Sequence, residues 1–130
     1  MIKSVIDVDG YWSVVLFVDV DYDRFDIIES ALTDILAPIK SIDNIYNKIA
    51  YKFNSGVTFT NSEFRTSLVC INKTTSREEL INTISHEADH VQDAICKYYG
   101  VPLESEDAAY LIGYLVSKIY YHSRRLFCSY

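Results

Sequence analysis

Apolar residues change their spacing along the chain, which separates strand-like from helix-like segments. A nearly continuous apolar run from Trp12 to Val20 is rich in Val and predicts a strand buried on both faces. A helix is expected from about Phe25 until Pro38 stops it. A second helix is expected from Ser41 to about Phe53, with Asn54-Ser55-Gly56 ending it. The first of these helices repeats its apolar residues on one face: Phe25, Ile28, Leu32 and Ile35. The N-terminal part of the chain therefore combines a buried strand with two amphipathic helices.

Two β-branched segments precede the longest helical pattern of the chain. Val57–Thr60 and Arg65–Ile71 are strand-like by composition. Ser76 begins a capping-box signature, and Gly100 suits the left-handed position that follows a helix end. We therefore predict a long helix from about Ser76 to Tyr99.

The order of these elements predicts a single α+β domain. The chain of 130 residues suits one domain, in which a strand and helix part, residues 1–72, precedes two helices within residues 76–125. We expect a small sheet packed on the long helix and on the C-terminal helix. Gly113 interrupts the C-terminal helical pattern, and we expect it to let the two helices approach closely.

Composition excludes several classes of partner. The net charge is −6, and the only basic cluster is Arg124-Arg125, so binding of nucleic acid through its phosphates is not expected. No apolar stretch approaches the ~20 residues of a membrane span.

The residues Cys70, Cys96 and Cys128 include no close pair, which indicates reduced thiols rather than a disulfide framework.

The segment His86-Glu87-Ala88-Asp89-His90 matches the pattern H-E-x-x-H. Histidines four residues apart share one helix face, roughly 5–6 Å apart at Cβ, so both imidazoles can bind one zinc ion at about 2.0–2.1 Å. Glu87 lies about 100° further round the helix, beside the position that a water on the metal would take. The spacing predicts a zinc site with Glu87 as the general base.

A catalytic zinc site needs a third protein ligand, and the residues alone leave several candidates. Glu106 opens the second helix after the Gly100-Val101-Pro102 turn, so its carboxylate can point back at the histidines. Glu104 could serve if that helix starts later. His122 lies about 24 Å along the helix from Glu106, so these two residues cannot both reach the metal. A site of two histidines completed by solvent is the remaining alternative.

The motif helix, the short turn and a Glu early on the next helix resemble the gluzincin branch of zinc metallopeptidases in a minimal, single-domain, zincin-like form. The run Glu106-Asp107-Ala108-Ala109-Tyr110-Leu111-Ile112-Gly113-Tyr114 is also similar to small H-E-x-x-H proteins of phages and mobile elements. The resemblance covers roughly Leu68 to Leu115. It implies the following roles: His86, His90 and Glu106 as zinc ligands and Glu87 as the base.

Three further features could support this site. Asp93, three residues beyond His90, or Asp89 could accept a hydrogen bond from an imidazole N–H. Tyr110 or Tyr114 could donate a hydrogen bond to a developing oxyanion. The predicted strand Thr66–Ile71 directly precedes the motif helix, and we expect it to offer an open edge on which an extended peptide pairs.

These features together predict a zinc-dependent hydrolase, most specifically a small metallopeptidase that acts on a peptide or protein. The alternative from another class is a non-enzymatic interaction protein of a phage or mobile element, with a structural or vestigial zinc site. A start without an apolar signal core favours a cytoplasmic location, which for a phage protein would be the host cytoplasm.

Overall fold

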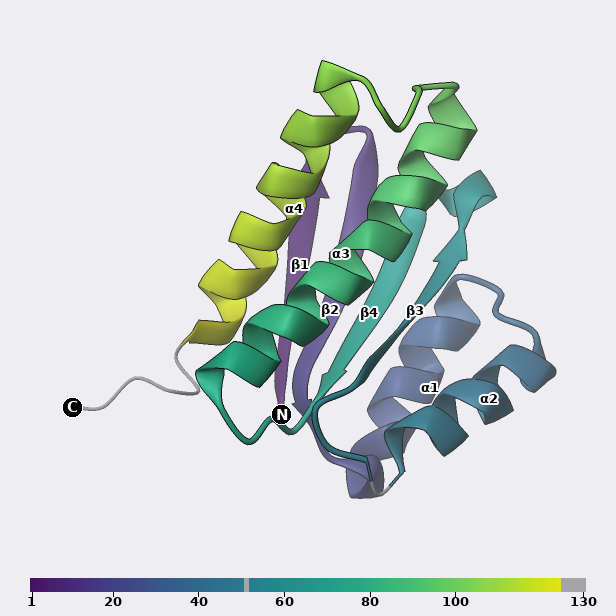
Figure 1. Ribbon diagram of the computed structural model, residues 1–130. Helices are drawn as coiled ribbons and strands as arrows, with labels where there is room; N and C mark the ends of the chain where they lie inside the picture. Colours follow the sequence, from purple (N-terminus) through teal and green to yellow (C-terminus); the bar gives the residue numbers. More distant parts are fainter. Residues whose placement is uncertain (51, 125–130) are drawn as a thin grey trace.

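The computed structural model describes residues 1–50 and 52–124. Four strands form one mixed sheet, and helices cover both of its faces (Figure 1). The strands are β1 (Ile2–Val8), β2 (Trp12–Val20), β3 (Gly56–Asn61) and β4 (Thr66–Asn72). The helices are α1 (Phe25–Asp34), α2 (Ile39–Ile49), α3 (Arg77–Tyr99) and α4 (Glu106–Ser123), with 3₁₀ turns at η1 (Tyr22–Arg24) and η2 (Ser62–Phe64). The predicted α+β class is confirmed.

The order of the strands across the sheet is β1-β2-β4-β3. The central strands β2 and β4 are parallel, while β1 and β3 run antiparallel to their neighbours at the two edges. The prediction that Thr66–Ile71 forms an open edge is therefore wrong, because β4 is paired on both sides. The edge strand beside the motif helix is β3.

Strand β1 was not among the predicted elements, because its pattern is weak. Only Ile6 and Val8 of this strand are buried, whereas Val5 is 61% exposed. Helix α2 begins directly after Pro38 and ends at Ile49, before the expected Phe53. Helix α4 ends at Ser123, and the expected end near residue 125 lies outside the described residues.

Two hydrophobic cores lie on opposite faces of the sheet. Helices α3 and α4 cover one face, and α1 and α2 cover the other (Figure 1). Strand β2 supplies Leu16 to the first core and Phe17 to the second, and neither side chain is exposed. Its burial on both faces confirms the interpretation of its continuous apolar run.

The ends of α3 are those predicted from its capping residues. The Ser76 hydroxyl accepts a hydrogen bond of 3.1 Å from the backbone N–H of Glu79. Gly100 has φ 72° after the last turn, a left-handed conformation that costs glycine little. Between these caps the helix buries one apolar stripe against the sheet: Leu80, Ile84, Ala88, Val91 and Ile95.

The close approach expected at Gly113 is not observed. This glycine is exposed, and an added Cβ would meet no atom within 4 Å. The contact between the helices is made elsewhere, where Gln92 Nε2 of α3 donates a hydrogen bond of 2.7 Å to the Ala108 carbonyl of α4. Gly113 therefore does not mark a point of close contact between α3 and α4.

Two of the three cysteines lie within the described residues, and both are buried free thiols, as predicted: Cys70 and Cys96. Cys128 lies outside the described residues. No helix in the described part of the chain combines the length and apolar character that crossing a membrane requires.

Replacement of Gly113 by Ala should stabilise the fold. Because the added methyl group meets open space and alanine reduces the conformational entropy of the unfolded chain, we expect Gly113→Ala to raise the free energy of unfolding by about 0.5–1 kcal/mol. Urea denaturation measures this change. A loss of stability would show that the helix surface at Gly113 is closed by a contact absent from this structure.

Candidate functional site

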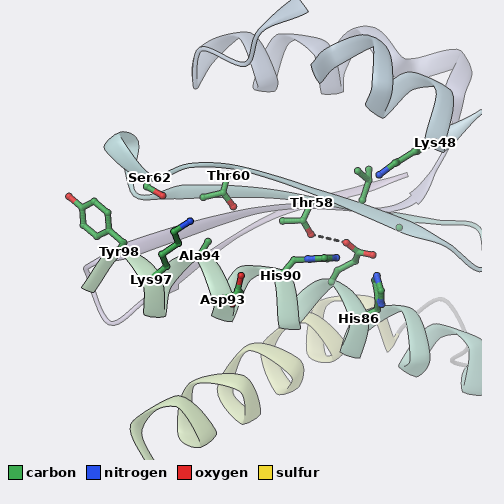
Figure 2. A pocket seen from close by; sticks show the side chains of 13 residues that line it. Lys48, Thr58, Thr60, Ser62, His86, His90, Asp93, Ala94, Lys97 and Tyr98 are labelled. Carbon is green, nitrogen blue, oxygen red and sulfur yellow. Dashed lines mark hydrogen bonds between the residues drawn. The ribbon is translucent and has the colours of Figure 1, made fainter. Parts of the chain in front are cut away.

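A cleft of about 630 Å³ lies between α3 and the edge strand β3 (Figure 2). The H-E-x-x-H helix forms one wall and β3 forms the other, while α2 contributes Lys48. The residues that line it are Lys48, Gly56, Val57, Thr58, Thr60, Ser62, His86, Glu87, His90, Asp93, Ala94, Lys97 and Tyr98. The motif thus opens onto a groove beside the edge of the sheet.

His86 and His90 lie one above the other on the cleft side of α3, as their spacing predicted. Their ring centroids are 4.9 Å apart and the ring planes are inclined by 82°. Both side chains are exposed, so their nitrogen atoms are accessible from the cleft. The sequence therefore predicted the relative position of the two imidazoles correctly.

Glu87 lies between these histidines and is only 2% exposed. Its Oε1 accepts a hydrogen bond of 2.8 Å from the Thr58 hydroxyl of β3, which Figure 2 shows as a dashed line. A buried carboxylate without a partner would be costly, so this bond stabilises the side chain in the cleft wall. The predicted base is thus held by the opposite wall.

Gly56 allows β3 to approach α3 at this point. A Cβ built on Gly56 would lie 2.7 Å from the Cys70 carbonyl oxygen and 2.9 Å from Glu87 Cγ. Both distances are shorter than van der Waals contact allows. Only glycine permits this spacing without a shift of the strand or of Glu87.

A smaller polar hollow of about 270 Å³ continues the cleft past the motif. It shares Gly56, His86 and Glu87 with the main cleft and is otherwise lined by Asn54, Ser55, Asn82 and Thr83. A groove therefore extends on both sides of Glu87, which is the arrangement an extended chain would need in order to pass the carboxylate.

Charged side chains of both signs lie along the main cleft. Lys48 reaches it from α2, while Asp93 and Lys97 follow His90 along α3 (Figure 2). Asp93 therefore lies on the same side of α3 as the two histidines, as expected from its spacing.

Cys70 is a buried thiol whose pKa is influenced by Glu87. Burial raises the pKa of the Cys70 thiol above its usual range, and the negative charge of Glu87 raises it further. A neutral buried thiol is a poor nucleophile.

The structure does not bring the remaining predicted residues into the cleft. Glu106 is exposed at the start of α4, and Tyr110, one turn later, is 74% exposed. Neither lines the cleft, and the rival ligands Glu104 and His122 are also absent from its walls. Within residues 1–50 and 52–124, no group of three or more His, Cys, Asp and Glu side chains is placed to hold a metal ion.

The position of α4 explains why Glu106 lies away from the histidines. Gln92, which bonds to α4, is two residues beyond His90 and so lies roughly 200° further round α3. Helix α4 also contacts β1, at the sheet edge opposite to β3. The turn after α3 therefore carries Glu106 to the side of the helix that faces away from the cleft.

Nine of the residues that line the cleft were not predicted from the sequence, and Lys48, Gly56 and Thr58 are among them. Gly56 was interpreted as part of a helix end, whereas it begins β3. The alternation of Thr58 and Thr60 with apolar Val57 and Phe59 indicates a strand with one polar face, but nothing in that alternation identifies Glu87 as the group this face contacts.

No protein family, curated protein or solved structure compared with this chain matches it.

The close contact at Gly56 makes this position sensitive to a single methyl group. We expect Gly56→Ala to lower the free energy of unfolding by about 1–3 kcal/mol, as overpacking of a buried contact does. Urea denaturation measures this change. Gly113→Ala is the matched control, because the same substitution is made there in open space. Equal effects at the two positions would contradict the tight packing of β3 against Glu87.

Proposed function

We propose that this protein is a zinc-dependent hydrolase, most specifically a small metallopeptidase, with His86 and His90 as metal ligands and Glu87 as the general base. The observation that carries the proposal is the juxtaposition of two accessible imidazoles with a buried carboxylate in one cleft. The same residues form the H-E-x-x-H pattern, and this pattern is typical of zinc-dependent peptide hydrolysis.

The donor groups present fit two of the coordination positions of zinc. Two imidazoles that share a tetrahedral zinc at about 2.0–2.1 Å hold their ring centres roughly 5 Å apart, and the observed separation is 4.9 Å. The described residues supply no third protein ligand. Solvent and substrate would occupy the remaining coordination positions of the zinc. The proposed site is therefore an open one with two histidine ligands, without the expected ligand Glu106.

The chain's own groups have clear tasks in peptide hydrolysis. Zinc bound by the imidazoles would polarise the scissile carbonyl and lower the pKa of the attacking water toward 7. Glu87 accepts the proton of this water and returns it to the leaving amine nitrogen. Because Thr58 holds Oε1, Oε2 is the oxygen left to take the proton.

An extended peptide would bind along β3. This strand has β4 as its single neighbour in the described sheet, so about half of its backbone N–H and C=O groups point away from the sheet. A substrate strand can pair with such an edge, and the cleft beside it continues on both sides of Glu87. A peptide bound along β3 would therefore pass beside the two imidazoles.

A non-enzymatic interaction protein is the second candidate, and the same open edge favours it. A peptide that pairs with β3 need not be cleaved, since pairing uses main-chain groups alone. A closed structural zinc site is less well supported, because structural zinc usually has four protein ligands. In this second candidate the zinc site would be vestigial.

Zinc content tests the metal site. We expect about one zinc ion per chain in protein purified without chelator, and loss of that zinc in the double variant His86→Ala/His90→Ala. Glu106→Ala serves as the matched control and should keep its zinc, because Glu106 lies away from the imidazoles. Elemental analysis measures the zinc content of all three proteins. Equal zinc in wild type and in the double variant would refute the proposed site.

Replacement of the base separates an enzyme from an interaction protein. Glu87→Gln should abolish cleavage of a peptide library while retaining zinc, since an amide cannot accept the proton of the water. Mass spectrometry of the library before and after incubation detects new termini. Cleavage that persists in Glu87→Gln would contradict the assigned base, and a zinc-loaded wild type that binds peptides without cleaving them would favour the interaction protein.

A further inference from the structure

Two threonines of β3 line the same cleft but have different partners. Thr58 and Thr60 are two residues apart, so their side chains leave the same face of the strand. The Thr58 hydroxyl donates its hydrogen bond to Glu87 Oε1 at 2.8 Å. The Thr60 hydroxyl instead lies 2.7 Å from Ser67 Oγ of the neighbouring strand. Of this pair, only Thr58 is bonded to the motif helix.

We propose that Thr58 is a positioning residue that orients the Glu87 carboxylate for proton transfer. This inference rests on the proposed function, in which Glu87 is the general base. A glutamate side chain has three rotatable bonds, and burial alone does not select the rotation of its carboxylate. The Thr58 hydroxyl has one proton to donate, and it gives that proton to Oε1. Oε2 is therefore the oxygen presented to a water in the cleft.

The location of Thr58 gives this bond a second consequence. Thr58 belongs to the edge strand on which an extended peptide would pair, so the substrate and the base are held by the same strand. Gly56, two residues earlier, keeps this strand in close contact with Glu87. A peptide seated on β3 would thus have a fixed register relative to the Glu87 carboxylate.

A purely structural role for the same bond makes a different prediction. If the bond only ties β3 to α3, its loss lowers stability and affects the substrate affinity and turnover of the remaining folded protein little. If the bond orients the base, its loss lowers turnover in protein that is still folded and still binds substrate. The kinetic parameters separate these two roles.

The test compares three variants on a peptide that the wild type cleaves. Thr58→Val keeps the shape of the side chain but removes the hydroxyl, and we expect kcat to fall by about 10–100-fold with KM within about twofold, as for a slightly misplaced catalytic group. Thr58→Ser restores the hydroxyl and should recover most of kcat. Thr60→Val removes a hydroxyl from the same wall without touching Glu87, so any effect it has should fall on KM.

A second measurement does not depend on turnover. Crystal structures of the wild type, Thr58→Val and Thr60→Val should show the Glu87 carboxylate displaced or in several conformers in Thr58→Val alone. Thr58→Ala replaces Thr58→Val if the latter does not fold. Unchanged kcat and an unmoved Glu87 in Thr58→Val would overturn the inference, as would an equal fall of kcat in Thr60→Val. A wild type that cleaves no peptide would refute the proposed function instead, and the structures would still decide whether Thr58 orients Glu87.

Discussion

One apolar stripe fixes which face of α3 is turned toward the sheet. The position of the cleft depends on that orientation. Leu80, Ile84 and Val91 are fully buried in the core against the sheet. Burial of each such side chain contributes about 1.5–3 kcal/mol, so a rotation that exposed them would be costly. With the stripe facing the sheet, His86 and His90 emerge on the flank that faces β3. The face that bears the two histidines is therefore oriented by residues that do not line the cleft.

The contact between β3 and α3 adds a second constraint, because it buries a carboxylate. Glu87 is almost completely enclosed, and an ionised group in such a position needs a hydrogen-bonding partner. Gly56 provides the space and Thr58 provides the donor. The same contact influences Cys70, whose pKa is raised by burial and by the Glu87 charge. Edge strand and motif helix thus form one unit around the proposed base.

The placement of α4 decides which of the proposed metal ligands can meet. The chain turns after Gly100 and packs α4 on the side of α3 that bears Gln92. Glu104 of the turn and Glu106 and Asp107 of the first turn of α4 consequently do not line the cleft. The two imidazoles keep an open side toward β3, where a substrate strand would lie. This openness suits substrate access and leaves coordination positions for groups other than protein side chains.

The sequence by itself determined the local features of the site. The four-residue spacing of His86 and His90, the Ser76 cap and the Gly100 end depend on helix geometry, which neighbouring residues set. The continuous apolar run of β2 likewise predicted burial on both faces. Each of these predictions uses residues within a few positions of one another, and each was confirmed.

Only the tertiary structure decided which distant residues meet. Two positions show this most clearly. Gly113 looked suited to a close helix contact and faces open space, whereas Gly56 looked like a helix end and lies against Glu87. The strand order placed β3 rather than β4 at the edge, and the packing of α4 separated Glu106 from the histidines. Such outcomes depend on which faces of several elements are buried together, and the spacing of residues within one element does not contain that information.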